Sequence, residues 1–399
     1  MSFLLRFPSS RPGSALPTSL PFGARTFLPR TVLVRRRSSV HLQHARNTST
    51  RVAEQAGKRP RGADLGYDRW EMKAIVIEAP GDESVMSLGE APEPELVAGA
   101  VRIRVAAAGV NRADLMQRQG MYPPPPGASE ILGLECAGEV LEVASDVTRF
   151  RPGDRAMALL TGGGYAEQVV VDAGSVLPIP DRLSFKQAAA VPEVFLTVFL
   201  NVFRLAGLGK GDSLLVHGGG SGIGTAAIQL ARAADASCLV TAGSPEKCQR
   251  CLDLGAEHAF NYRDGDFAPK LLEATGGRGV DVILDHIGAS YLDANIRSLS
   301  VGGRLVIIGL MGGAKAEIQL AAVLGKRLQL IGSTLRARPL EEKRQIASGF
   351  LEQFGAGLES GRIAPVIDRE FPLEQAAAAH RLMAASHHFG KIVLSLAGV

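Results

Sequence analysis

The stretch Gly211–Leu230, GDSLLVHGGGSGIGTAAIQL, decides the fold. It begins with a short apolar run, Ser213–His217, which favours a parallel strand buried on both faces. A glycine-rich turn, Gly218–Gly224, follows, and Thr225–Arg232 then has the composition of a helix. Strand, glycine-rich turn and helix in this order predict a cradle in which the backbone approaches a dinucleotide pyrophosphate at a helix N-terminus.

The cradle departs from the usual G-x-G-x-x-G spacing at one position. The three positions are Gly219, Ser221 and Gly224, so a serine stands where the middle glycine is expected. A serine hydroxyl can itself bond a phosphate oxygen. The alternative interpretation is a glycine-rich turn that holds no ligand.

After about Val191 the chain alternates short apolar runs with helical stretches, such as Pro245–Leu254 and Tyr291–Leu299. This alternation predicts an α/β domain with a doubly wound parallel sheet, which we assign to residues 191–332. Its predicted strands are Ser213–His217, Ser237–Ala242, His258–Asn261, Val280–Asp285, Arg304–Gly309 and Arg327–Ser333.

Residues 72–190 have another pattern, in which short apolar or alternating runs are bounded by Pro and Gly. We expect a compact antiparallel, barrel-like domain there. The tail, residues 333–399, contains a predicted helix near Leu340–Leu358 and a closing strand, Lys391–Leu396, and we expect it to return to this domain. The predicted strands of residues 72–190 are Lys73–Glu78, Ala100–Ala107, Glu139–Val143, Arg155–Leu160 and Ala166–Val171.

The basic charge of the chain lies in residues 1–71. They hold 13 Lys and Arg against 4 Asp and Glu, so the remainder carries −5 although the 399-residue chain carries +4. A mildly acidic body argues against nucleic-acid binding. The leader is rich in Arg and Ser and poor in acids, as transit peptides are. The alternative is a disordered leader, or translation from an upstream start, because Met72 opens MKAIVIEAPG as a natural first strand would.

The four cysteines give no disulfide framework, which suggests a reducing compartment. We therefore expect a cytoplasmic protein, or an organellar one if the leader is a transit peptide. The sequence has no run of 18 apolar residues, so we expect no transmembrane helix and no membrane partner.

The end of the second strand of the α/β domain favours NADPH over NADH. NAD-binding domains place Asp or Glu about 20 residues after the glycines, where it bonds the ribose 2′-hydroxyl. Here the strand ends Thr241-Ala242-Gly243-Ser244, without an acid, and Lys247 follows. Ser244 and Lys247 would hold a 2′-phosphate that a carboxylate would repel, and Tyr262 could flank the pocket. The alternative for Lys247 is a solvated helix lysine.

Three further segments accompany the cradle and its preceding Gly211-Asp212: Ala107–Tyr122 (AAGVNRADLMQRQGMY), Gly309–Gly313 (GLMGG) and Gly390–Leu394 (GKIVL). With them, residues 72–399 resemble the zinc-free quinone oxidoreductases of the medium-chain dehydrogenase/reductase superfamily. The resemblance implies a GroES-like catalytic domain, a Rossmann domain and NADPH in the cleft between them. It also implies reduction of quinones or other α,β-unsaturated carbonyls, usually by a homodimer.

The resemblance further implies which residues contact the cofactor. They are Asn111 and Thr197 at the nicotinamide; Gly219, Ser221, Gly222, Ile223 and Gly224 at the pyrophosphate; Ser244, Lys247 and Tyr262 at the 2′-phosphate; Ile287, Gly288, Leu310 and Met311 beside the nicotinamide half; and Phe389, Gly390 and Lys391 closing over it.

Two positions argue against a catalytic zinc. Zinc members of the superfamily carry a ligand Cys where this chain reads Gly109-Val110-Asn111, and a ligand His where it has Leu134. Leucine cannot bind zinc, and Cys248 and Cys251 lack the second pair or histidine that a metal site requires. We therefore expect no metal. His286 is either a proton donor or, more simply, a packed histidine.

Without a metal, hydride addition to a conjugated carbonyl is easier than alcohol oxidation, because the product charge is delocalised. We take Asn111 and Tyr122 as candidate catalytic residues that orient the acceptor and hydrogen-bond its oxygen. The alternatives are a structural amide for Asn111 and a ring packed on Pro123–Pro126 for Tyr122. The sequence identifies no proton donor, and water can serve. Other readings of the whole chain are an enoyl-thioester or alkenal reductase and a non-catalytic, crystallin-like NADPH-binding protein.

Overall fold

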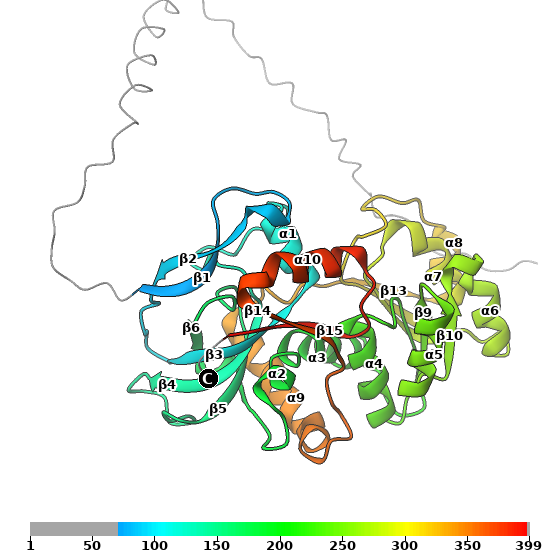
Figure 1. The fold of residues 1–399 in the computed structure, drawn as a ribbon. Coiled ribbons are helices and arrows are strands. Elements are labelled where there is room, and N and C mark those ends of the chain that lie inside the picture. Colours follow the sequence, from blue (N-terminus) through cyan, green and yellow to red (C-terminus); the bar gives the residue numbers. More distant parts are fainter. Residues whose placement is uncertain (1–70, 397–399) are drawn as a thin grey trace, which may run out of the picture. The chain divides into compact units, whose positions relative to one another are not determined.

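The structure is a computed structural model, and it describes residues 71–396 (Figure 1). The expectation of a leader or transit peptide concerns residues 1–71, of which residues 1–70 lie outside this range. Within the described range the chain forms two large sheets and one two-stranded sheet.

The six-stranded sheet is entirely parallel, in the order β10-β9-β8-β11-β12-β13. When these six strands are numbered in chain order, the sheet has the 3-2-1-4-5-6 order of a Rossmann fold. The predicted fold class is therefore confirmed. Its strands are β8 (Ser213–Val216), β9 (Ser237–Ala242), β10 (His258–Asn261), β11 (Val280–Asp285), β12 (Leu299–Ile307) and β13 (Gln329–Gly332).

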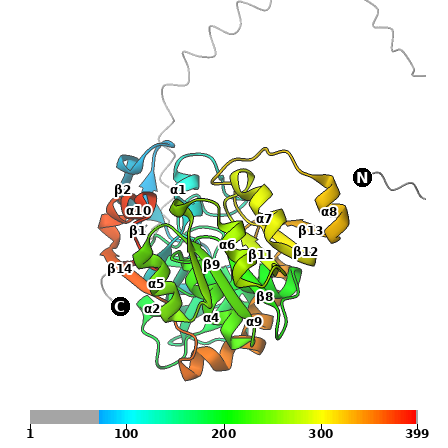
Figure 2. The same ribbon diagram turned by 90° about the vertical axis from the view of Figure 1, so that its right-hand side faces the viewer.

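Helices cover both faces of this sheet (Figure 2). On one face, α4 (Gly222–Ala233) contacts α5 (Pro245–Leu254). On the other face, α7 (Leu292–Ser298) contacts both α6 (Phe267–Ala274) and α8 (Leu320–Lys326). The carboxyl ends of the strands therefore form one edge, where the loops after β8, β9 and β11 meet.

The second large sheet has the order β14-β15-β3-β4-β5-β7, with β6 also paired to β3. Its pairs are antiparallel except β14–β15, as expected of the β-rich part. The strands are β3 (Ala100–Val110), β4 (Glu135–Val143), β5 (Arg155–Leu159), β6 (Gln168–Asp172), β7 (Val176–Pro178), β14 (Ile367–Pro372) and β15 (Lys391–Ser395), and β1 (Glu71–Ile77) pairs separately with β2 (Met86–Pro92).

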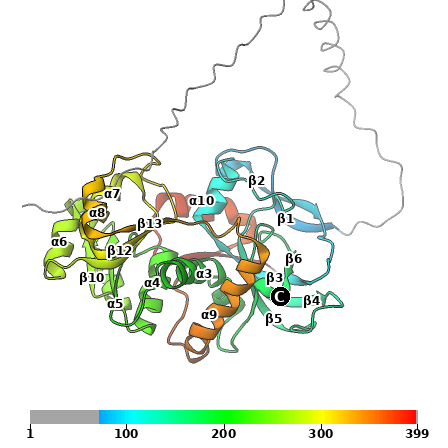
Figure 3. The same cartoon turned by 180° about the vertical axis from the view of Figure 1, so that it is seen from behind.

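The tail returns to the first strands, as predicted, because β15 pairs with β3. On the way, α9 (Leu340–Ser360) packs against α3 (Pro192–Val198) and against α4, which covers the parallel sheet. It also packs against β7 of the second large sheet (Figure 3). After β14, α10 (Ala376–Ala385) leads into β15. The remaining helices are η1 (Glu83–Val85), α1 (Arg112–Arg118), η2 (Ala173–Ser175), α2 (Phe185–Ala188), the π-helical η3 (Phe199–Leu205), η4 (Tyr262–Asp264), η5 (Ala289–Tyr291) and η6 (Leu373–Gln375).

One helical stretch, Phe185–Leu205, is long and apolar enough to cross a membrane by length and composition, with a mean hydropathy of 1.6. However, 83% of the most apolar 18 residues of this stretch are buried inside the protein. Its apolar side chains pack with α4, α9 and the strands, so its hydropathy is that of a core helix.

Candidate functional site

The glycine cradle is shaped by close backbone packing. Ser221 caps α4 by accepting the Gly224 N–H at 3.0 Å. A Cβ on Gly224 would lie 2.5 Å from the Gly218 carbonyl oxygen and also against that of Gly219, so only glycine fits there. Among residues 71–396 no acceptor takes the Ser221 hydroxyl proton, which leaves it for a phosphate oxygen. The serine in place of the middle glycine is thus compatible with the cradle.

The segment Phe389–Lys391 lies directly on the cradle. The Gly390 N–H donates to the Gly220 carbonyl at 2.9 Å, and Gly390 and Ser221 form an isolated β-bridge. The Phe389 ring and the Lys391 stem occupy the space that side chains on Gly220 and Gly222 would need. The structure therefore places Phe389, Gly390 and Lys391 in contact with the residues that are predicted to hold the pyrophosphate.

Ser244, Lys247 and Tyr262 also lie together, beside the carboxyl end of β9. Ser244 caps α5 by accepting the Lys247 N–H at 3.2 Å, and the Tyr262 hydroxyl lies over Gly243. The Lys247 ammonium donates to the carbonyls of Ser386 at 2.7 Å and His388 at 2.8 Å. Lys247 is therefore not simply a solvated lysine, since it ties α5 to the segment before β15 and keeps one N–H for a ligand.

Asn111 belongs to a buried cluster with Glu135 and Lys391. The Lys391 Nζ lies 2.6 Å from both Glu135 Oε1 and Asn111 Oδ1, and the Asn111 Nδ2 donates to Glu135 Oε1 at 2.9 Å. Lys391 is 3% exposed and Glu135 is fully buried. Both the oxygen and the nitrogen of the Asn111 amide are thus already hydrogen-bonded within the protein. This favours a structural role for Asn111 over a hydrogen bond to the acceptor.

Tyr122 is held by Arg336 and not by Asn111. The buried Arg336 donates to the Tyr122 carbonyl at 3.2 Å, and its guanidinium carbon lies 5.2 Å from the Tyr122 ring centroid. Burial and the nearby Glu193 raise the pKa of the Tyr122 phenol, so the hydroxyl stays protonated and can donate. This geometry is compatible with Tyr122 orienting an acceptor.

The residues expected at the nicotinamide include a buried threonine and two loops that bond to each other. Thr197, on α3, is buried, and within the described part of the chain its Oγ1 has no hydrogen-bond partner. The loop with Ile287 and Gly288 bonds to the loop with Leu310 and Met311, since the Gly312 N–H donates to the Ile287 carbonyl at 2.7 Å. Leu310 and Met311 are more than half exposed, which leaves apolar surface for a ring to cover.

His286 packs against the cradle. Its imidazole occupies the space that a side chain on Gly218 would need. Burial lowers the pKa of His286 to about 4, so it is neutral near pH 7. A neutral imidazole is a poor acid, and the packed alternative is favoured.

Sequence reasoning did not single out Glu135, Glu193 or Arg336. Glu193 had a signal, since it is the one charged residue between Lys186 and Arg204 in an otherwise apolar stretch. Glu135 had one too, since Gly133-Leu134-Glu135 stands where the zinc enzymes have G-H-E. Arg336 had none, because its partners are far away in sequence. Arg336 also donates to the Thr161 carbonyl and to Gln117, so it ties the loop after β13 to the Tyr122 loop.

The donor set does not suit zinc. Leu134 is buried in the position expected of a histidine ligand. The Cys251 sulfur packs beneath Gly219, and burial raises the pKa of its thiol to about 12. Within residues 71–396 no three His, Cys, Asp or Glu side chains gather as a metal site would require.

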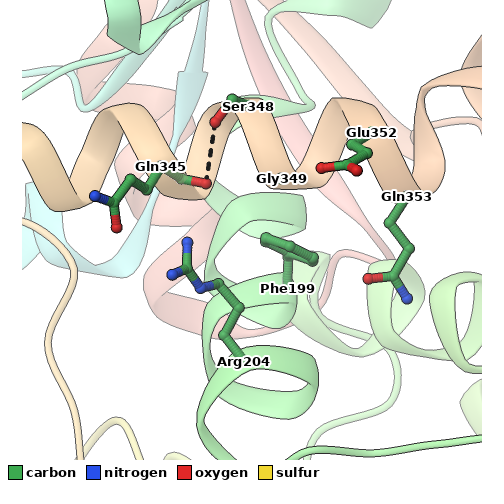
Figure 4. Close-up of a pocket in the computed structure, with 7 residues that line it drawn as sticks. All are labelled: Phe199, Arg204, Gln345, Ser348, Gly349, Glu352 and Gln353. Carbon is green, nitrogen blue, oxygen red and sulfur yellow. Dashed lines mark hydrogen bonds between the residues drawn. The ribbon is translucent and has the colours of Figure 1, made fainter.

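A separate surface hollow of about 570 Å³ lies between η3 and α9 (Figure 4). It shares no residue with the groups described above. Its lining consists of Phe199, Arg204, Gln345, Ser348, Gly349, Glu352 and Gln353.

The chain matches two family models. Residues 97–181 match the alcohol dehydrogenase GroES-like domain, and residues 254–394 match the zinc-binding dehydrogenase model. Quinone oxidoreductase from the rat, Rattus norvegicus, is 35% identical over 328 residues, which are 82% of this chain and 98% of the rat protein.

Solved structures agree with these matches. An NAD-dependent alcohol dehydrogenase is 33% identical with a TM-score of 0.73, covering 81% of this chain and 99% of that one. The CurK enoyl reductase is 27% identical with a TM-score of 0.73, covering 82% and 99%.

Fold, cradle and relatives together define an oxidoreductase of the medium-chain dehydrogenase/reductase class, and they indicate a nicotinamide cofactor. Within that class, the chain belongs to the quinone oxidoreductase family.

Proposed function

We propose that this protein is an NADPH:quinone oxidoreductase, which reduces quinones or other α,β-unsaturated carbonyls without a metal. The observation that carries the proposal is the glycine cradle closed by Phe389–Lys391. The unpaired Thr197 hydroxyl is on α3, the helix whose Val194 packs on Gly222 of the cradle. When bound, the reduced nicotinamide supplies a hydride. The chain's own part is to bind the cofactor, orient the acceptor and exclude water.

The preference for NADPH is supported by the end of β9. Thr241–Ser244 contains no acid, and the Ser244 cap, Lys247 and Tyr262 lie together there. An ammonium with one free N–H and two hydroxyls suit a 2′-phosphate, whereas the carboxylate that usually accepts from the ribose hydroxyls of NAD is missing.

A quinone acceptor is supported by the name of a relative and by the side chains around Tyr122. The rat relative is named a quinone oxidoreductase. Tyr122, protonated and fixed by Arg336, would orient a flat carbonyl acceptor above the apolar surface of Leu310 and Met311. Asn111 would position Lys391 beside the cradle.

A second candidate is an enoyl-thioester or alkenal reductase, which the likeness to the CurK enoyl reductase favours. Steady-state loss of NADPH should be measured with 1,2-naphthoquinone, other ortho-quinones, a 2-alkenal and an enoyl thioester. Fastest turnover with quinones supports the proposal, and fastest turnover with the thioester supports the second candidate. NADPH binding without turnover of any acceptor would instead indicate a binding protein, and failure to bind NADPH at micromolar concentration would overturn all three.

A further inference from the structure

Glu193 is an acid that the site contains and that the roles above do not use. It occupies the first turn of α3, just after Pro192. Thr197 follows four residues later, so the two side chains share one face of the helix. Because Thr197 is the residue we place at the nicotinamide, helical spacing directs the Glu193 side chain to the cofactor end of the site.

The main chain of Glu193 is anchored, while its carboxyl is free. Its N–H donates to Glu135 Oε2 at 2.8 Å, which fixes the start of α3 on the Asn111–Glu135–Lys391 cluster. Among the residues that the structure describes, no donor or acceptor pairs with the Glu193 carboxyl, and the residue is half-buried. Because the backbone of Glu193 is fixed and its carboxyl has no partner among the described residues, the carboxyl can bond to a bound molecule.

The same carboxyl is an electrostatic neighbour of Tyr122 and Arg336. It lies close enough to the Tyr122 phenol and the Arg336 guanidinium to influence the pKa of both groups. Val194, the residue after Glu193, packs 3.0 Å from the Cβ position of Gly222, so this turn of α3 lies against the cradle.

The charges around Glu193 favour its protonated form. Burial has the largest effect, Glu135 and Asp114 add repulsion, and together they outweigh the attraction of Lys391 and Arg336, so the pKa of Glu193 rises to about 8. At neutral pH the group is a carboxylic acid that holds a transferable proton. The charged and titratable groups facing it are Glu135 on β4, Asp114 on α1, Lys391 on β15, Arg336 before α9, Lys343 on α9 and Tyr122.

We propose that Glu193 is the proton donor of this site and delivers its proton to the oxygen of the acceptor while Tyr122 orients it. The proposal rests on the proposed function. The acceptor gains two electrons and one hydrogen with the hydride, and the second hydrogen arrives as the Glu193 proton, so a quinone becomes a hydroquinone. The carboxyl O–H bond breaks, an O–H bond forms on the acceptor, and the carboxylate regains a proton from water.

The first test is the pH dependence of turnover in Glu193→Gln, which keeps the size and polarity of the side chain but cannot donate an acid proton. For the unmodified protein, kcat with 1,2-naphthoquinone should fall as pH rises through about 8. The variant should lack this fall and be slower at neutral pH by about 10²–10⁴-fold, the usual contribution of general acid catalysis. Glu352→Gln, an exposed position on α9, is the matched control and should match the unmodified protein.

A second comparison varies the acceptor. Strongly electron-poor quinones form hydroquinone anions that are stable without immediate protonation. The penalty of Glu193→Gln should therefore shrink with such a quinone and be largest with a 2-alkenal. A variant that merely disturbs the fold would lower the rate with every acceptor alike.

A third test needs neither cofactor nor turnover. With its pKa raised from 4.5 to about 8, Glu193 holds in the folded state a proton that the unfolded chain releases. Its contribution to stability is therefore present below pH 4.5 and is lost as pH rises towards 8. As the pH rises across this range, the urea midpoint of Glu193→Gln should therefore increase relative to that of the unmodified protein.

The outcomes separate the two proposals. If the unmodified protein reduces quinones while Glu193→Gln keeps the alkaline fall in kcat, the proton-donor role is wrong and the proposed function stands. A uniform loss with every acceptor, together with a pH-independent difference in urea midpoint, would also overturn the role. Absence of turnover in the unmodified protein would overturn both.

Discussion

At the scale of single residues, Lys247 combines two contacts that one substitution can separate. Its ammonium holds the carbonyls of Ser386 and His388, and we propose that its remaining N–H binds the 2′-phosphate of NADPH. Lys247→Ala should raise the KM for NADPH by about 10-fold or more, since a charge-assisted hydrogen bond contributes roughly 1.5–3 kcal/mol. The KM for NADH should change far less. Steady-state kinetics with both cofactors measures the difference.

The exposed Lys270→Ala on α6 is the control for charge alone and should leave both KM values unchanged. Equal increases in both KM values for Lys247→Ala would mean that the lysine acts only by holding the segment before β15, and the assignment of a 2′-phosphate site would fail.

Gly224 tests the cradle itself. A Cβ there would press on two backbone carbonyls, which cannot move as a flexible side chain would. Gly224→Ala should therefore weaken NADPH binding strongly and lower the free energy of unfolding by about 1–3 kcal/mol, as overpacking does. Fluorescence titration with NADPH and urea unfolding measure the two effects.

Gly209→Ala is the matched control for Gly224→Ala, because nothing lies within 4 Å of its Cβ position. It should bind NADPH normally. Normal binding by Gly224→Ala as well would show that the turn relaxes and that the glycine is not required.

At the scale of secondary-structure elements, the buried Glu135–Lys391 pair joins β4 to β15 and, through the Glu193 N–H, to α3. Removing one partner leaves a buried charge without its counter-ion. Glu135→Ala should therefore lower the free energy of unfolding by about 3–5 kcal/mol. The urea midpoint and slope give this value.

The exposed Lys186–Glu370 pair is a control of the same 2.6 Å length. Glu370→Ala should cost less than about 1 kcal/mol, because solvent screens exposed charges. A similar loss in both variants would indicate that the Glu135–Lys391 pair contributes no more than a surface contact.

The elements that sequence predicted well are those set by local pattern. Ser237–Ala242, His258–Asn261 and Val280–Asp285 are strands with the predicted bounds, because apolar runs between turns identify buried parallel strands. Arg304–Gly309 was placed too late, since β12 begins at Leu299 directly after α7. There the strand follows the helix without the loop residues that mark a boundary.

Charged contacts between distant elements could not be predicted. The Lys391 ammonium meets the Val110 carbonyl across 281 residues and Glu135 across 256. A lone lysine and a lone glutamate have no periodicity that would reveal such a pairing. The same reason explains why Asn111 was predicted at the acceptor, whereas the structure engages its amide with Lys391 and Glu135.

At the scale of the whole molecule, the site depends on both large sheets. Gly390 joins the cradle to β15, Lys391 joins β15 to Asn111, and Arg336 joins the segment after β13 to the Tyr122 loop. The residues that we propose for cofactor and acceptor are therefore fixed relative to one another by contacts that cross between the sheets. Substitutions at these contacts should alter cofactor binding and acceptor turnover together.

The outer edge of the parallel sheet bears on assembly. β13 is the last strand of the sheet, and within the described residues nothing pairs with its outer side. Leu320 and Leu324 on the adjoining α8 are 70% and 81% exposed. An unpaired edge beside exposed leucines is a surface that natural proteins usually cover, and we propose that a second copy of this chain covers it.

Leu324→Asp should disrupt such a homodimer, because a carboxylate buried in an apolar interface lacks a counter-ion. Light scattering should give the mass of two chains for the unmodified protein and of one chain for the variant. Val97→Asp, at an exposed position before β3, should remain dimeric. If the unmodified protein is monomeric, or if both variants remain dimeric, this edge does not form the interface, and the exposed leucines of α8 need another explanation.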